Sequence, residues 1–171
     1  MSQPNIILTG FMGTGKTTLG QLLAEKIGYE FIDTDTLIET QIGQTISNLF
    51  QKQGEETFRK LESELVEKLA QKQRLVIATG GGLVLDPNNV ALLSKTGQII
   101  CLTASPEEIL SRVSGQQGAR PLLQGKDPLE KISQLLQQRA SVYRQFPQFS
   151  TSKLSRKELL NRLVTFTQEK S

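Results

Sequence analysis

The hydrophobic positions of the chain form short apolar runs, separated by longer stretches with helical periodicity. The apolar runs, each a candidate buried strand, are residues 5–8, 31–32, 75–78 and 99–102. Their apolar residues are consecutive rather than alternating, which is typical of parallel strands buried on both faces. The pattern therefore predicts the α/β fold class, with helices packed on both faces of a parallel sheet.

Helical periodicity follows the candidate strands. Apolar residues recur at three- and four-residue spacings at 19–27 and at about 55–71, 129–143 and 156–167. Ser155 and Glu158 have the spacing of a capping box at the start of the last segment, and Ser105-Pro106 has the form of another helix start. Residues 114–125 are polar and contain three glycines, so we expect a mobile loop there.

A glycine-rich segment after the first strand, residues 10–17, matches the phosphate-binding pattern G-x-x-x-x-G-K-[ST] at every position. In this pattern, backbone amides and the N-terminal end of the following helix bind phosphate oxygens. Lys16 is expected to reach the β- and γ-phosphates, and the Thr17 hydroxyl to bind Mg²⁺. An ordinary glycine turn is the alternative, but the strand and helix that nucleotide binding requires are both present. The expected phosphate contacts are Gly13, Thr14, Gly15, Lys16, Thr17 and Thr18.

Two carboxylates, Asp33 and Asp35, stand where the second strand gives way to a helix. In extended backbone their side chains share a face. One is a candidate to position the metal, and the other to accept a proton or hydrogen bonds from an acceptor hydroxyl. The alternative for Asp35 is a helix N-cap before Thr36. Because the carboxyl ends of parallel strands meet at one rim, both aspartates should lie near the phosphate loop and near Gly80-Gly81-Gly82.

Three arginines are candidates for anion binding, and the residues around them leave each assignment open. Arg59 has Glu55 and Glu62 at helical spacing, which favours a surface salt bridge over a carboxylate-binding role. Arg120, in the glycine-containing loop, is either a cation for the transferring phosphoryl group or a solvated surface residue. Arg139, on the helix near 129–143, is likewise either functional or an ordinary surface residue.

Composition narrows the chemistry. The 171 residues include no histidine and one cysteine, Cys101, which excludes Ser-His-Asp hydrolysis, Cys-His proteolysis and histidine- or thiolate-bound zinc. The lone cysteine also favours a reducing compartment. The pattern N-K-x-D is absent and the third strand ends without an aspartate, which argues against switch GTPases and large ATPases and favours a small-molecule kinase. No linker or repeat divides the chain, so we expect one domain over residues 1–171.

These motifs together resemble the shikimate kinase family over nearly the whole chain. The matching segments are G-F-M-G-T-G-K-T-T at 10–18, D-T-D at 33–35, F-R-K-L-E at 58–62, T-G-G-G at 79–82, R-P-L-L at 120–123 and Q-R-A-x-x-Y at 138–143. The resemblance implies a P-loop NTPase fold with three layers and a five-stranded parallel sheet. It also implies acceptor-binding helices at about 35–71, a mobile lid at about 114–125, and transfer of the γ-phosphoryl group of MgATP to the 3-hydroxyl of shikimate.

The resemblance implies a role for each acceptor-side candidate. Asp35 would hold the shikimate hydroxyls and act as base, and Arg59 and Arg139 would bind the shikimate carboxylate. The glycine turn Gly80-Gly81-Gly82 would contact the ring, chiefly through the backbone at Gly81. For Arg59 this implication replaces the surface salt bridge that spacing alone favours.

On the nucleotide side, the resemblance makes Arg120 the lid arginine on ATP, with Lys16 as its catalytic partner, and makes Asp33 an outer-sphere aid to Mg²⁺ bound at Thr17. Arg112 matches an adenine-side arginine of the family if one residue is inserted after it.

A second adenine-side loop of the family corresponds to residues 150–154, which lack the aspartate often found there. Lys153 and Arg156 are further candidates to line this part of the site.

Three alternatives stand beside this interpretation. Another P-loop kinase, such as one for gluconate, would share the phosphate loop and lid but not the pair Arg59 and Arg139. A non-catalytic nucleotide-binding relative would be expected to lose Lys16, Asp35 or Arg120. Nucleic-acid binding, suggested only by the isoelectric point of about 9.1, predicts a steep salt dependence.

The expected partners are therefore ATP and shikimate, without nucleic acid or membrane. We expect a cytoplasmic monomer, or a plastid protein only if a transit peptide has been removed.

Overall fold

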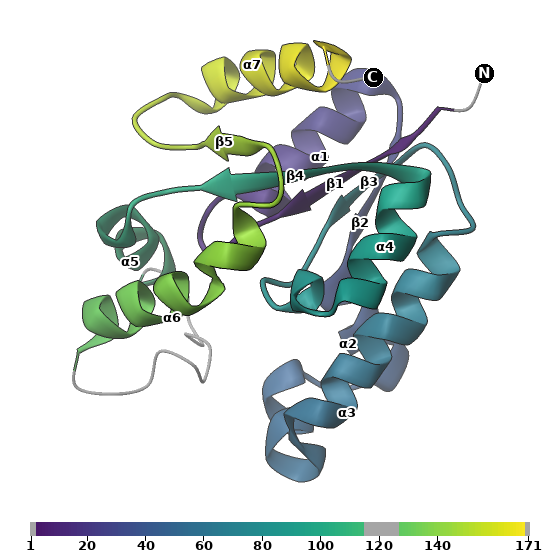
Figure 1. Cartoon of the computed structure of the whole chain (residues 1–171), viewed down its shortest axis with the longest axis vertical. Helices are drawn as coiled ribbons and strands as arrows, with labels where there is room; N and C mark the ends of the chain where they lie inside the picture. Colours follow the sequence, from purple (N-terminus) through teal and green to yellow (C-terminus); the bar gives the residue numbers. More distant parts are fainter. Residues whose placement is uncertain (1–2, 115–126, 170–171) are drawn as a thin grey trace.

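A single parallel sheet organises the fold. The computed structural model describes residues 3–114 and 127–169. Within them the strands are β1 (Asn5–Thr9), β2 (Glu30–Asp33), β3 (Leu75–Ala78), β4 (Gly97–Thr103) and β5 (Gln148–Ser150), in the spatial order β2-β3-β1-β4-β5 (Figure 1). All neighbouring pairs are parallel. The expected five-stranded parallel sheet is confirmed.

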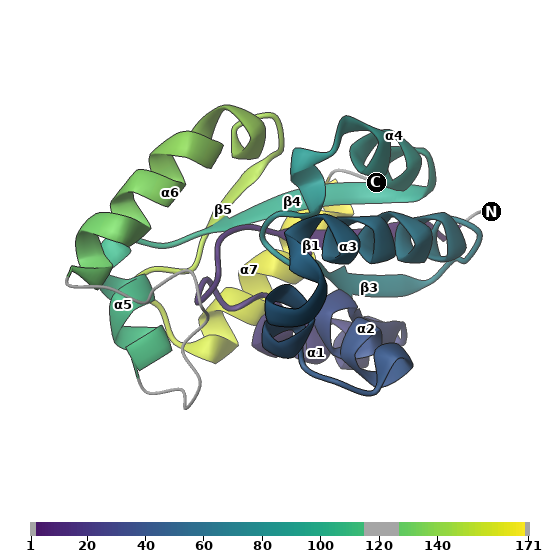
Figure 2. The same ribbon diagram turned by 90° about the horizontal axis from the view of Figure 1, so that it is seen from below.

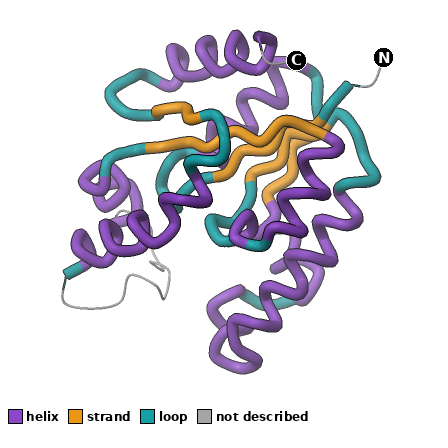
Figure 3. The backbone as a smooth tube through the Cα atoms, viewed as in Figure 1, coloured by secondary structure: helices purple, strands orange, loops and turns teal. Residues whose placement is uncertain are grey.

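Helices cover both faces of the sheet. They are α1 (Lys16–Ile27), α2 (Thr34–Ile42), α3 (Ile46–Leu69), α4 (Pro87–Thr96), α5 (Pro106–Ser114), α6 (Pro128–Tyr143) and α7 (Arg156–Glu169), with a short 3₁₀ turn, η1, at Leu83–Leu85. Figures 2 and 3 show α1 and α7 on one side of the strands and α3 and α4 on the other. The layers are therefore α/β/α, as predicted.

Alternate residues of the central strand supply the two cores. Ile7 of β1 packs with Leu65 and Leu93 in the cluster beneath α3 and α4. Ile6 and Leu8 pack in the opposite cluster, beneath α1 and α7. Because successive side chains of a strand point to opposite faces, a consecutive apolar run is what a strand buried on both faces requires.

The carboxyl ends of β1, β2 and β3 meet at one rim, as expected for parallel strands. The amide of Gly80, just after β3, donates to the Thr34 hydroxyl, just after β2, over 3.0 Å. The glycine turn therefore lies directly beside the aspartate-bearing segment, and this rim holds the residues that the sequence singles out.

Two helical regions differ from expectation. The helix expected at about 55–71 begins at Ile46, and it is interrupted at Gly54, whose φ of 83° is not helical. Helix α4 was not predicted, because its apolar residues, at 90–93, are consecutive and do not recur at helical spacing. It starts from the Asp86 cap with Pro87 at its first position.

The predicted helix starts at Ser105 and Ser155 are confirmed. At the latter, the Ser155 hydroxyl donates to Glu158 Oε2 over 2.7 Å, and the Glu158 amide donates to the Ser155 hydroxyl over 3.3 Å. The predicted lid at 114–125 lies, apart from Ser114 at the end of α5, outside the described residues. In residues 3–114 and 127–169, no helix is both long and apolar enough to cross a membrane.

Candidate active site

The phosphate loop connects β1 to α1 and is shaped by close backbone approach. Gly10 has a φ of 132°, and a Cβ there would overlap the carbonyl oxygen of Leu102 in β4, so only glycine fits. Lys16, the first residue of α1, donates from Nζ to the carbonyl oxygens of Gly10 (2.8 Å) and Phe11 (2.7 Å). Its ammonium group therefore lies across the loop, beside amides that follow the phosphate-binding pattern.

Asp33 connects this loop to the second strand. Its Oδ2 accepts a hydrogen bond from the Thr17 hydroxyl over 2.7 Å, and its Oδ1 accepts one from the Thr36 amide over 3.1 Å. Asp33 is therefore the N-cap of α2, and the alternative that Asp35 is the cap is wrong. Asp35 lies inside the first turn of α2, so the two carboxylates do not share a face of extended chain. Both carboxylates nevertheless line the same cavity.

A cavity of about 550 Å³ opens above the phosphate loop and is large enough for a small ligand. It is lined by all of the loop residues expected to contact phosphate, and also by Asp33, Asp35, Arg112 and Arg156. Lys153 is not among the lining residues. Arg120 lies outside the described residues.

Arg112, on α5, ties two sides of this cavity together. Its Nη1 donates to the carbonyl oxygen of Gly13 (2.9 Å) and to the hydroxyl of Thr151 (3.1 Å), and its Nη2 donates to the Thr151 carbonyl (3.1 Å). A second contact from α5 joins the Glu108 carboxylate to the Ser152 hydroxyl. The expected adenine-side arginine therefore holds the phosphate loop against the loop after β5.

The glycine turn Gly80-Gly81-Gly82 is the point where the acceptor-side candidates meet. The distance from each glycine's hypothetical Cβ shows how closely the side chains approach the turn. A Cβ on Gly80 would lie 2.6 Å from Asp35 Oδ1, and a Cβ on Gly81 would lie 3.0 Å from Arg139 Nη1. On its third residue a Cβ would lie 2.5 Å from Arg59 Nη2. Three different helices therefore place a charged side chain beside the glycine turn. These side chains are Asp35 of α2, Arg59 of α3 and Arg139 of α6.

Arg139 is held in place by aromatic neighbours. Its guanidinium lies 5.5 Å from the centroid of the Phe11 ring, within the range of a cation–π contact. Its Nη1 donates to the Tyr143 hydroxyl (3.4 Å), which in turn donates to the carbonyl oxygen of Gly81 (2.6 Å). Burial raises the pKa of Tyr143, so this hydroxyl stays a donor near neutral pH. Sequence reasoning gave Tyr143 no role, although it stands in a matched motif.

Arg59 forms the salt bridges that its spacing predicts. Nη2 lies 2.8 Å from Glu55 Oε1, and Nη1 lies 2.7 Å from Glu62 Oε2. The two partners differ sharply, because the side chain of Glu55 is 59% exposed and that of Glu62 only 1%. Burial, with a smaller effect from the charge of Asp35, raises the pKa of Glu62 to about 7, although Arg59 opposes the shift. Sequence reasoning treated Glu62 only as a surface partner and missed its burial.

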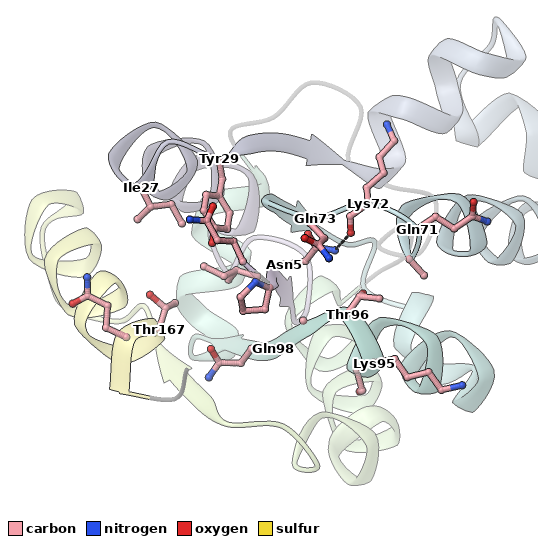
Figure 4. Close-up of a pocket in the computed structure, with 17 residues that line it drawn as sticks. Asn5, Ile27, Tyr29, Gln71, Lys72, Gln73, Lys95, Thr96, Gln98 and Thr167 are labelled. Atoms are coloured by element: carbon pink, nitrogen blue, oxygen red, sulfur yellow. Dashed lines mark hydrogen bonds between the residues drawn. The ribbon is translucent and has the colours of Figure 1, made fainter. Parts of the chain in front are cut away.

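A second cavity, of about 680 Å³, lies at the opposite end of the sheet (Figure 4). Its described lining residues include no carboxylate, no arginine and no part of the phosphate loop. Its central amide, Asn5, is committed to the fold, since it donates to the Lys72 carbonyl (2.9 Å) and accepts from the Leu75 amide (2.9 Å). The side chains of Lys72 and Lys95 extend away from it (Figure 4).

A phosphate loop after the central strand, with two arginines beside a glycine turn at the same rim, is the arrangement of a P-loop small-molecule kinase. The family model described as shikimate kinase matches residues 12–168. A shikimate kinase of Thermoanaerobacter pseudethanolicus is 50% identical over 140 residues, which cover 82% of this chain and 81% of that protein. The chain belongs to the shikimate kinase family.

Solved structures agree with this assignment. Shikimate kinase from Acinetobacter baumannii, solved in complex with shikimate, is 36% identical with a TM-score of 0.91, and the match covers 99% of this chain and 95% of that one. A gluconokinase from Sinorhizobium meliloti is 17% identical with a TM-score of 0.56, covering 100% of this chain and 99% of that one. The second similarity concerns the fold alone.

Proposed function

We propose that this protein transfers the γ-phosphoryl group of ATP to the 3-hydroxyl of shikimate. The observation that carries the proposal is the convergence of Asp35, Arg59 and Arg139 on the glycine turn, at the same rim as the phosphate loop. Two guanidinium groups select a carboxylate, because charge-assisted and often bidentate hydrogen bonds suit that anion. A carboxylate, Asp35, suits neutral hydroxyls, which donate to it.

The bare backbone of the turn fits a flat, hydroxylated ring. With no side chains on Gly80-Gly81-Gly82, an acceptor can approach the main chain while its carboxylate reaches the arginines. A gluconate kinase would share the phosphate loop, and gluconate also carries a carboxylate. The pair of arginines therefore supports a hydroxy acid as the acceptor, and the 36% identity with a shikimate kinase solved with shikimate favours shikimate within that class.

The phosphate side of the site fits MgATP. Thr17 and Asp33 offer hard oxygen ligands at the edge of the phosphate loop, the kind that Mg²⁺ prefers. Within the described part of the chain no three acidic, histidine or cysteine side chains gather into a metal site, so phosphate oxygens and water would complete the coordination. When bound, Mg²⁺ neutralises charge on the phosphates. Lys16 would bind the phosphates with the loop amides, and Arg112 and Arg156 would line the nucleotide side.

In the proposed reaction, the 3-hydroxyl oxygen of shikimate forms a bond to the γ-phosphorus as the bond between that phosphorus and the β–γ bridging oxygen breaks, which releases ADP. Asp35 accepts the hydroxyl proton. Positioning and charge stabilisation account for most of the catalysis in such transfers. Lys16 supplies part of that charge, and we propose the same for Arg120.

The test is release of ADP from MgATP with shikimate, quinate, gluconate or a nucleoside monophosphate as acceptor. We expect turnover with shikimate to exceed turnover with every other acceptor, and to collapse in Arg139→Ala while nucleotide still binds. Nucleotide binding without shikimate-dependent turnover in the wild-type protein would contradict the proposal. Faster turnover with gluconate would move the assignment to a different small hydroxy acid.

A further inference from the structure

The two glutamates that contact Arg59 stand in different surroundings. Glu55 reaches the guanidinium from the solvent side of α3, whereas Glu62 lies beneath it and is almost completely buried. Exposed ion pairs contribute little and exchange readily with solvent. A buried carboxylate instead needs a partner for each of its oxygens, or a proton.

Among the described residues, Glu62 has a hydrogen-bond partner for only one of its carboxylate oxygens. Its Oε2 accepts from Arg59 Nη1, while its Oε1 is buried and makes no hydrogen bond within the described residues. If Gly80 carried a Cβ, that atom would lie 3.1 Å from Glu62 Oε1 and 2.6 Å from Asp35 Oδ1. Two buried carboxylate oxygens, one from each residue, therefore face one spot beside the acceptor site.

The charges around Glu62 shift against its ionisation when an anion binds. Among the described residues, Arg59 favours the ionised form, whereas Glu55 from α3 and Asp35 from α2 disfavour it, and the glycine turn carries no charge. An acceptor carboxylate on Arg59 and Arg139 adds another negative charge, which disfavours ionised Glu62. The pKa of Glu62 is already raised to about 7 by burial, so both of its forms are populated near neutral pH.

Building on the proposed function, we propose that Glu62 is a positioning residue that holds Arg59 through Oε2 and takes up a proton at Oε1 when the acceptor carboxylate binds. The proton comes from solvent, and Arg59 keeps its charge throughout. The protonated oxygen becomes a donor facing Asp35. The acceptor site thereby gains an anion without gaining a net negative charge.

The test is isothermal titration calorimetry of shikimate binding at about pH 7.5, in two buffers with different ionisation enthalpies. We expect the wild-type protein to take up on the order of half a proton per shikimate bound, because a group of pKa about 7 is mostly ionised before binding. Its affinity should weaken by up to about tenfold per pH unit above 7. Glu62→Gln mimics the protonated form, so it should bind shikimate with almost no proton uptake and little pH dependence.

Glu55→Gln is the matched control, because it removes the other carboxylate on Arg59 and should leave most of the proton uptake in place, since Glu55 has the smallest effect of the charges that act on Glu62. A purely structural role for Glu62 would change the affinity but not the proton count. Carboxyl ¹³C NMR of the wild-type protein gives a second readout that needs no variant, since the Glu62 signal should move to its protonated position on addition of shikimate.

Shikimate binding without proton uptake in the wild type, or with equal uptake in Glu62→Gln, would overturn this inference alone. Absence of shikimate binding would overturn the proposed function and this inference together.

Discussion

Gly82→Ala should separate acceptor binding from stability. The added Cβ would lie 2.5, 2.6 and 2.7 Å from Nη2, Nη1 and Cζ of Arg59. Ordinary contact distances are about 3.5 Å or more, so the guanidinium must move by about 1 Å. It must do so while Glu62 holds it from below. A misplacement of about 1 Å can cost on the order of 100-fold in rate, so we expect kcat/KM for shikimate to fall by about 10- to 100-fold.

Stability should barely change in the same variant. Gly82 has φ −96° and ψ −6°, a conformation that alanine adopts without strain. Alanine also restricts the unfolded chain, which offsets a small native-state cost. We therefore expect the free energy of unfolding to stay within about 1 kcal/mol of wild type, and KM for ATP to stay unchanged. Steady-state kinetics with each substrate varied, beside urea unfolding, measures all three quantities.

A double-mutant cycle checks that the effect passes through Arg59. If it does, Gly82→Ala should cost little more in an Arg59→Ala background, because the clashing group is gone. An unchanged kcat/KM in the single variant would refute the reasoning, and so would an equal loss in both backgrounds.

Three further predictions concern other parts of the site. Asp35→Asn should fold and bind nucleotide but lose about 10²- to 10⁴-fold in kcat, as expected for loss of a general base, and near-normal turnover would remove Asp35 from the chemistry. Arg112→Ala should raise KM for ATP by about tenfold with KM for shikimate unchanged, since its hydrogen bonds position Gly13 and Thr151; an equal rise in both KM values would count against this assignment. The pKa of Glu62 is raised from 4.5 to about 7, so the folded protein binds this proton more tightly than the unfolded chain. The contribution of Glu62 to stability should therefore fall by roughly 3 kcal/mol between about pH 4.5 and 7. Glu62→Gln should remove this fall, and parallel pH profiles in urea unfolding would contradict it.

Local signals predicted much of the fold and of the nucleotide side. Consecutive apolar residues located the cores of β1 to β4, and the phosphate loop and the capping box at Ser155 each depend on residues within a few positions of one another. Such patterns can be recognised in a sequence because the residues that interact are close together in the chain. Helix α4, whose apolar residues are consecutive rather than helically spaced, and the break at Gly54 gave no comparable signal.

Contacts distant in sequence could not be predicted from the residues alone. Arg112 and Gly13 are 99 positions apart, and Tyr143 and Gly81 are 62 apart, so only the folded sheet brings each pair together. The sequence also gave no sign that one of the two glutamates beside Arg59 is buried. Helical spacing correctly predicted both of its glutamate partners, but tertiary packing decides that Glu62 is enclosed and Glu55 is not.

The proposed activity is tested most directly by NMR analysis of the product formed from MgATP and shikimate. We predict ADP and a phosphorylated shikimate whose phosphorus couples to the proton on C3. Phosphorus found only in unreacted ATP or as free phosphate, or coupled to a proton at another position, would contradict the assignment.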